Sequence, residues 1–213
     1  MNPIIIQGNN IITKGYKLEH CRKHCAKSAQ DWTEQYRQLE ELLEDLQITH
    51  FINQQFPHLN HHHLPKIALA GCPNGCSQPQ IKDIGISGYL TPRLTENPCT
   101  GCRLCVTSCP ENAITWTDEN IILDLNRCLS CGDCVRACPT EKISCGETGW
   151  QISLGGRLGR HPQLAEISSF EKSTDDVIAK IRMILSDYLE NSLPRERLSQ
   201  FLERRSYSAL LRS

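Results

Sequence analysis

Two runs of four cysteines in the middle of the chain offer metal-binding chemistry at a fixed spacing. Both have the spacing C-x2-C-x2-C-x3-C followed by proline, and they consist of Cys99, Cys102, Cys105 and Cys109, then Cys128, Cys131, Cys134 and Cys138. In this pattern three closely spaced thiolates hold one [4Fe–4S] cluster while the fourth reaches across to the other. Two tandem copies argue against disulfides and zinc sites. We therefore expect this part of the chain to move electrons one at a time.

The crossing of each fourth cysteine predicts the ligands of the two clusters. Cluster one is expected to use Cys99, Cys102, Cys105 and Cys138, and cluster two Cys128, Cys131, Cys134 and Cys109. The proline after each crossing ligand turns the chain away, because it cannot continue a helix. The repeat resembles bacterial two-cluster ferredoxins, so we expect residues 95–147 to form a unit of that type.

Four more cysteines suggest a third cluster outside this unit. Cys72 and Cys76 enclose Pro73 and Gly75, which let the backbone turn tightly so that both thiols point at one spot. Cys21 and Cys25 supply a second pair, and four thiolates suit a third [4Fe–4S] cluster. The alternative for either member of that second pair is a buried free thiol. Cys145 is left over, and we expect an ordinary buried or surface thiol there.

Hydrophobic periodicity predicts the elements that position these cysteines. An amphipathic helix is expected over residues 31–47, and the remaining elements are strands at 65–71, 81–86, 121–123 and 150–154 and helices at 174–189 and 194–205. A strand precedes the ferredoxin-like unit and another follows it. We therefore expect an α+β fold in which that unit, residues 95–147, is inserted into a discontinuous domain made of residues 1–94 and 148–213.

Composition limits the expected binding partners and the expected cellular location. The chain has 213 residues with 23 basic and 24 acidic side chains, so nothing points to nucleic acid or to a membrane surface. No stretch is long enough to span a bilayer. The apolar residues 4–6 are too few for a signal-peptide core and lack a basic lead. Thirteen cysteines without an export signal favour metal ligands over disulfides, and the cytoplasm is the expected location.

Three motifs resemble one enzyme family. The segment Gly71–Cys76, followed by Ile81–Ile86, is similar to the second cluster motif of sirohaem-containing sulfite and nitrite reductases. So are Gly155–Pro162 and the closing segment Arg195–Leu202. The resemblance extends over about residues 15–205. Dissimilatory and anaerobic members carry a two-cluster ferredoxin unit at the same place, and small assimilatory-type members have a similar layout.

The resemblance implies a cofactor and a reaction. The cysteine that matches Cys76 bridges a cluster and the sirohaem iron, and the distal position stays open for sulfite. Reducing sulfite to sulfide takes six electrons, which the clusters supply one at a time. Nitrite is the alternative substrate. A haem-free electron-transfer subunit of a larger redox complex is the alternative function.

Sirohaem is polyanionic, so cationic side chains are expected around it. The best candidates are Arg157 and Arg160 beside flexible glycines, with His161, Lys82 and Arg93 behind them.

Two departures from the family concern the start of the chain. Cys21 and Cys25 are separated by three residues instead of the usual five. Only some twenty residues precede Cys21, so the basic half that precedes this domain in larger members is expected to be absent. A partner subunit or a second copy would then cover the haem face, and an external protein would donate electrons. His58, His61, His62 and His63 are expected to form a polar surface loop.

Overall fold

The structure is a computed structural model that describes residues 5–7, 10–12, 14–117 and 120–207. The extreme ends of the expected discontinuous domain, and part of the apolar start, lie outside the described residues. The strands are β1 (Ile5–Gln7), β2 (Asn10–Ile12), β3 (Lys17–His20), β4 (Lys66–Ala70), β5 (Ile84–Leu94), β6 (Ile114–Thr117), β7 (Asn120–Leu123), β8 (Ile143–Leu154) and β9 (Glu166–Glu171). The helices are α1 (Thr33–Asp45), α2 (Ile48–Gln55), the 3-10 turn η1 (Pro79–Ile81), α3 (Leu104–Ser108), α4 (Asp133–Ala137), α5 (Thr174–Asn191) and α6 (Leu198–Arg204).

A mixed sheet with the strand order β3-β4-β5-β8-β9 forms the centre of the molecule. β3, β4 and β5 run parallel, with Ile67 of β4 opposite Ile84 of β5, whereas β8 and β9 are antiparallel to their neighbours. The apolar sequence of β4 is almost wholly buried, as expected for a central parallel strand. This mixed sheet with flanking helices confirms the expected α+β class.

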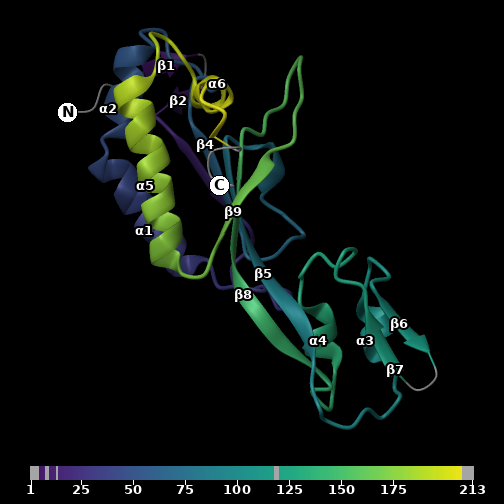
Figure 1. The fold of residues 1–213 in the computed structure, drawn as a ribbon. Coiled ribbons are helices and arrows are strands. Elements are labelled where there is room, and N and C mark those ends of the chain that lie inside the picture. The colour runs from purple at the N-terminus through teal and green to yellow at the C-terminus, as the bar shows by residue number, and fades with distance from the viewer. Residues whose placement is uncertain (1–4, 8–9, 13, 118–119, 208–213) are drawn as a thin grey trace.

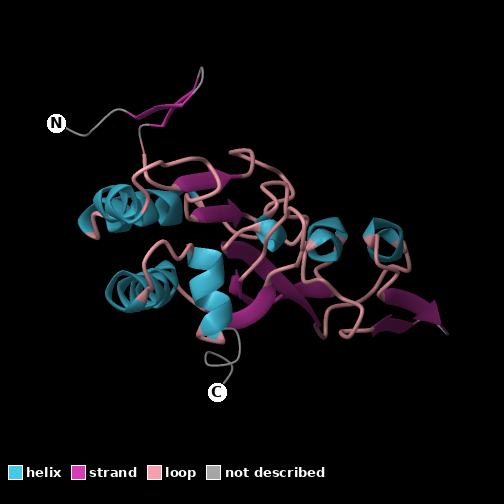
Figure 2. Ribbon diagram, turned by 90° about the horizontal axis from the view of Figure 1, so that it is seen from above, coloured by secondary structure: helices cyan, strands magenta, loops and turns pink. Residues whose placement is uncertain are grey.

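Helices α1, α2 and α5 pack on one face of this sheet (Figures 1 and 2). One hydrophobic core contains Leu39 and Leu43 of α1, Ile181 and Leu185 of α5 and Ile86 of β5, and all five are fully buried. The helical residues recur at helical spacing, so each helix presents one apolar face that packs in the core. No helix of the described chain segments is long and apolar enough to cross a membrane.

A smaller lobe lies where β5 ends and β8 begins (Figure 1). These two strands continue past the other strands as an antiparallel ribbon, up to the pair Leu94 and Ile143, with an irregularity between Leu90 and Pro92. The lobe contains α3, α4 and the β6–β7 hairpin. Its own small core includes Ile114 and Ile143 together with the buried thiols of Cys105 and Cys134.

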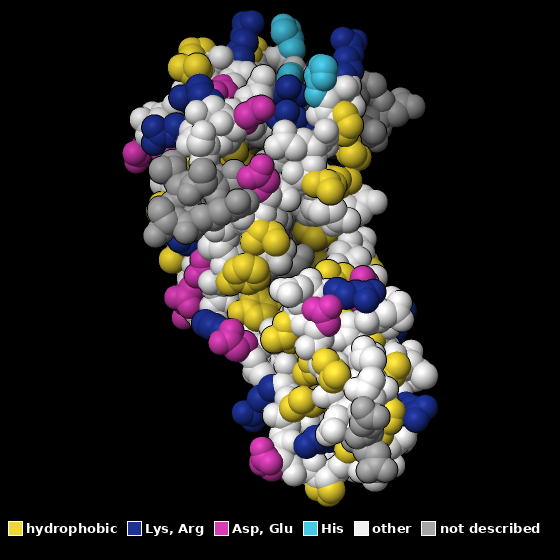
Figure 3. Space-filling model, turned by 45° about the vertical axis from the view of Figure 1, so that its right-hand side comes forward, with side chains coloured by type: hydrophobic (Ala, Val, Ile, Leu, Met, Phe, Trp, Pro, Cys, Tyr) yellow, Lys and Arg dark blue, Asp and Glu magenta, His cyan; other side chains and the backbone are white. Residues whose placement is uncertain are grey.

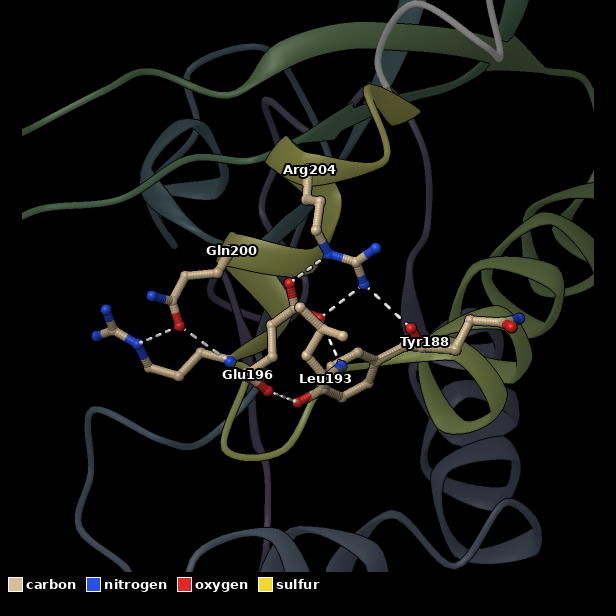
Figure 4. A network of polar contacts seen from close by, with 7 residues as sticks. Tyr188, Leu193, Glu196, Gln200 and Arg204 are labelled. Atoms are coloured by element: carbon tan, nitrogen blue, oxygen red, sulfur yellow. Dashed lines mark hydrogen bonds and ion pairs between the residues drawn. The ribbon is translucent and has the colours of Figure 1, made fainter.

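A polar network fastens the segment before α6 to the end of α5 (Figure 4). The hydroxyl of Tyr188 donates a hydrogen bond of 2.7 Å to the carbonyl of Glu196. The Glu196 carboxylate accepts from the Leu193 N–H at 2.9 Å and from the Arg204 guanidinium at 2.7 and 2.8 Å. Because Glu196 is buried, these bonds replace the water that its carboxylate loses. They fix the position of α6, which borders a basic cavity at one end of the sheet.

The observed elements differ from the expected ones mainly in their bounds. The strand expected at 81–86 begins at Ile84, because Pro79–Ile81 forms a 3-10 turn. The strand expected at 150–154 begins at Ile143, so part of it lies in the segment assigned to the insert. The sequence did not predict several short elements, namely β1, β2, β3, β6, β9, α2, α3 and α4.

Candidate functional site

Four cysteines converge at the edge of the sheet where the parallel strands β3 and β4 end. Cys21 follows β3 directly, and Cys72 and Cys76 lie in the tight turn after β4. Burial raises the pKa of the Cys72 thiol, and the neighbouring charges of Cys21, Cys25 and Cys76 raise it further. Because parallel strands end at the same edge, the topology brings the two sequence-distant pairs together. We call these four residues the third cysteine set.

The loop of Cys25 is fastened to the end of β4. The N–H groups of Ala29 and Gln30 donate to the Gly71 carbonyl at 2.8 and 2.9 Å. A side chain at Gly71 would place its Cβ only 1.8 Å from the Ser28 Oγ, so glycine is required for this close approach.

Hydrogen-bond donors point at two sulfurs of the third set. The Gly71 N–H lies 3.3 Å from the Cys21 Sγ, and the Asn74 amide Nδ2 lies 3.0 Å from the Cys76 Sγ. Donors aimed at sulfur stabilise thiolates, the form that binds iron. Cys76 is exposed whereas Cys72 is half-buried, so one thiol of the set faces outward.

The two cysteine runs of the lobe also interleave. Burial raises the pKa of the Cys134 thiol to about 12, and the charges of Cys128, Cys131 and Cys109 add to this effect. In the other half, burial raises the pKa of Cys105, and its charged neighbours include Cys138 and Cys102. The third cysteine of each run therefore lies close to the fourth cysteine of the other run.

Backbone N–H groups contact the crossing sulfurs in this lobe. Ala113 N–H lies 3.4 Å from the Cys109 Sγ, and Ile143 N–H lies 3.4 Å from the Cys138 Sγ. All thirteen cysteines are free thiols in this structure. Within the described ranges, no three His, Cys, Asp or Glu side chains meet the geometry of a single metal ion. In a [4Fe–4S] cluster each of the four irons binds one thiolate. The four cysteine sulfurs therefore surround the whole cluster and are farther apart than the ligands of a single metal ion.

The two sets of the lobe lie at different distances from the sheet. Leu90 of β5 forms a bridge to Cys131, and its N–H donates to the Ser130 carbonyl at 2.7 Å. The set of cluster two therefore adjoins the sheet, and α4 lies next to the β5–β8 ribbon (Figure 1). The set of cluster one lies beyond it, and its Cys99 and Cys102 are exposed.

A basic cavity of about 580 Å³ lies at the opposite end of the strands, where β4 and β5 begin. Its basic lining residues are His62, Lys66, Arg157, Arg160, His161 and Arg197. Arg157 also forms an ion pair of 2.7 Å with Glu203. Asp83 lines the same cavity and is buried, and its carboxylate accepts the Lys66 N–H at 2.6 Å. Burial raises the pKa of Asp83 to about 6, although Lys66, Arg197 and Lys82 counteract this.

The 3-10 turn η1 connects this cavity to the third cysteine set. Gln80 approaches both: a Cβ added at Gly75 would lie 3.0 Å from the Gln80 side-chain oxygen, and one added at Gly156 would lie 2.7 Å from the Gln80 carbonyl. Gly156 is therefore needed for the close approach of the Arg157 loop to η1.

Two of the expected basic residues lie away from the cavity. Lys82 has its side chain almost fully buried in an ion pair with Glu19 of β3. Arg93 lies at the lobe end of β5 and donates to the Ser144 hydroxyl at 3.2 Å. Cys145 is exposed on β8.

A second cavity, of about 790 Å³, separates the helix-free face of the sheet from the lobe. The sheet contributes Gln151, Ile167 and Phe170, and the lobe contributes Leu129 and Cys128. Ile167, Phe170 and Leu129 are exposed, and Figure 3 shows hydrophobic side chains gathered between the two parts. A ligand or protein covering this face would meet an apolar surface that adjoins the cysteines of cluster two.

A family model for the nitrite and sulphite reductase 4Fe-4S domain matches residues 9–213. The chain belongs to this family. Membership and the free cysteines together support iron–sulfur clusters, and they confirm the family resemblance of the three motifs.

Relatives within the nitrite and sulphite reductase 4Fe-4S family are larger proteins. A coenzyme F420-dependent sulfite reductase of Methanocaldococcus jannaschii is 39% identical over 68% of this chain, which corresponds to 24% of that protein. One of the subunits of the anaerobic sulfite reductase of Salmonella typhimurium is 31% identical over 52% of this chain and 27% of its own length. The chain thus spans about a quarter of these relatives.

The fold agrees with this membership. The crystal structure of dissimilatory sulfite reductase I superposes with a TM-score of 0.60 at 20% identity, covering 92% of this chain and 51% of that one. Sequence reasoning missed Arg197, His62 and Asp83 as lining residues of the basic cavity. For Arg197 a signal existed, because it lies within the closing motif Arg195–Leu202 that the sequence singled out.

Proposed function

We propose that this chain is the cluster-bearing part of a sirohaem-dependent sulfite reductase that reduces sulfite to sulfide. The observation that carries the proposal is the exposed Cys76 within a converging set of four cysteines. A thiolate that holds an iron cluster and also faces outward can ligate a second metal centre. Buried thiolates such as Cys105 and Cys134 lack that access.

In this proposal the cysteine sets hold three [4Fe–4S] clusters, and electrons pass between them in a fixed order. Cluster one, with the exposed Cys99 and Cys102, receives electrons from an external donor protein. Cluster two adjoins β5 through Cys131 and Leu90 and passes them on. The third cluster, held by Cys21, Cys25, Cys72 and Cys76, delivers them to the substrate site. This order follows the distance of each set from the sheet.

The donor set of the molecule fits a polyanionic macrocycle. Arg157, Arg160 and His161, joined by Arg197, would hold its carboxylates, because all four line one cavity. When bound, sirohaem supplies an iron that takes the sulfur of sulfite and accepts electrons singly. Cys76 would be its ligand from this chain, and Gln80 lies between the ligand and the basic residues. Lys82 and Arg93 have no role in this arrangement, because they are engaged elsewhere.

The name of one relative supports a partner. The Salmonella relative is one subunit of an anaerobic sulfite reductase, so a further subunit or a second copy would complete the oxyanion site. The apolar cavity between sheet and lobe is the surface that such a component would cover.

The experiment is to purify the protein anaerobically, supply sirohaem, and record the visible spectrum of Cys76→Ser beside the unmodified chain. Haem retention and sulfite reduction should disappear in the variant while the two lobe clusters persist. Cys145→Ser is the matched control, because this cysteine is exposed and belongs to no set. Unchanged haem content in Cys76→Ser would refute the bridging role.

A haem-free electron-transfer subunit is the second candidate. It is favoured by Arg157, whose guanidinium already has an acidic partner in Glu203. In that case the unmodified chain shows only the broad absorption of clusters after incubation with sirohaem. Nitrite remains the alternative substrate, and parallel assays with sulfite and nitrite distinguish the two.

A further inference from the structure

A single arginine of the lobe bridges the loops that carry two cysteine sets. Arg136 lies in α4, and its terminal nitrogen Nη2 donates to the carbonyl of Cys131 at 2.8 Å and to the carbonyl of Lys27 at 3.3 Å. Cys131 belongs to the set of cluster two. Lys27 lies two residues after Cys25, which belongs to the third set. The two loops are 109 residues apart in sequence at this contact.

The Arg136 side chain is held in place from its own helix. The same nitrogen contacts the Asp133 carboxylate at 2.8 Å, one turn earlier in α4. Asp133 also lies 4.0 Å from the Lys27 ammonium group. The arginine side chain is about one-third exposed, so the charge attraction itself contributes little. All three contacts use Nη2, and the planar guanidinium fixes the direction of the N–H groups on this nitrogen, which is the property that matters here.

We propose that Arg136 is a positioning residue that sets the separation of cluster two and the third cluster. This inference rests on the proposed function, because it requires both clusters. The ribbon of β5 and β8 is the covalent connection between lobe and sheet, and it is irregular between Leu90 and Pro92. A two-strand ribbon bends more easily than a packed sheet, so contacts beside it are needed to hold the lobe at one distance. The Leu90 N–H makes one such contact with the Ser130 carbonyl, and Arg136 adds another next to the ligands of both sets.

The test is the magnetic interaction between the two reduced clusters, measured by electron paramagnetic resonance in the full chain with its clusters. The unmodified protein should show a splitting of the third-cluster signal by cluster two. Arg136→Ala should lose this splitting at unchanged iron and sulfide content, and electrons should reach the third cluster more slowly. Arg136→Lys should restore part of it, because lysine keeps a charged donor but not the planar group that fixes its direction.

Lys27→Ala is the matched control. It removes the charge near Asp133 but leaves the backbone carbonyl that Arg136 contacts, so the splitting should persist. An unchanged splitting in Arg136→Ala overturns the inference, and so does an equal loss in Lys27→Ala. If Arg136→Ala loses iron, Arg136→Lys decides: full iron with a weakened splitting supports positioning, whereas iron loss in both variants overturns it. Absence of the third cluster in the unmodified protein refutes the proposed function and with it this inference.

Discussion

The buried carboxyl group of Asp83 should titrate far from the ordinary aspartate range. Asp83 directly precedes β5, and its carboxylate accepts a hydrogen bond from the Lys66 N–H. Burial raises its pKa from 3.8 to about 6. By linkage, a change of this size corresponds to about 3 kcal/mol of differential stability.

The sign of this contribution follows from which state holds the proton. Between the unfolded and folded pKa values the folded chain keeps the Asp83 proton and the unfolded chain has lost it. The stability from protonated Asp83 is therefore complete below the unfolded pKa and is lost as the pH rises through about 6. In Asp83→Asn the side chain stays neutral and keeps an oxygen for Lys66. This variant should not lose the roughly 3 kcal/mol that the unmodified chain loses from about pH 4 to about pH 7.

An infrared difference titration under anaerobic conditions measures this group directly. The stretching band of a protonated carboxylic acid should vanish with a midpoint near the pKa of about 6, and Asp83→Asn should lack it. Thermal unfolding midpoints of both proteins across the same pH range give the stability difference. Asp175→Asn, an exposed change in the first turn of α5, serves as control. A midpoint at the ordinary aspartate pKa, or parallel stability profiles, would show that burial does not govern this carboxyl group.

Three further predictions concern the clusters and α6. Asn74→Leu removes the donor that lies 3.0 Å from the Cys76 sulfur, so the reduction potential of the third cluster should fall; a redox titration that finds an unchanged potential contradicts this. Cys105→Ala removes a buried cysteine that we propose as a ligand of cluster one, so reduction of the third cluster by a protein donor should slow while haem content stays constant; full turnover would place the lobe off the electron path. Glu196→Ala removes the acceptor of the Arg204 pair and should cost about 2 kcal/mol, after allowing for the partly exposed arginine. Because the Arg204 hydrogen bond lowers the pKa of Glu196, this stability is present above the ordinary glutamate range and is lost as the pH falls below it, which thermal unfolding at several pH values would reveal.

Elements with strong periodicity could be predicted from the sequence, and weakly patterned ones could not. The helix expected at 174–189 is α5, Thr174–Asn191, because its apolar residues recur at helical spacing and Ser173 caps it. β9 was missed because Glu166–Glu171 is mostly polar and carries two exposed apolar side chains. β8 was predicted too short because Gly146 and Gly149 look like turn residues, yet both lie inside the strand.

The residues of the candidate site could likewise be predicted only where they are close together in the sequence. Ligands within one run are close in sequence, so their spacing alone predicts a shared metal site. The basic cavity is assembled from the loop at His62, the start of β5 at Asp83, and Arg197 before α6, which no local pattern connects. Lys82 looked like an available cation, but its ion pair with Glu19 depends on the neighbouring strand β3.

The topology explains why all three cysteine sets lie on the same side of the sheet, two of them in the lobe beyond its edge. β3, β4 and β5 are parallel, so Cys21, Cys72 and the entry into the lobe after Leu94 all follow strand ends at that edge. β8 returns antiparallel to β5 and begins where β5 ends, so a lobe at this point interrupts no strand pairing. The same lobe placed after a strand that ends at the opposite edge would lie on the side of the basic cavity instead of beside the third set. Electron transfer between clusters requires short distances, and this insertion point is the one that the sheet geometry favours for such a relay.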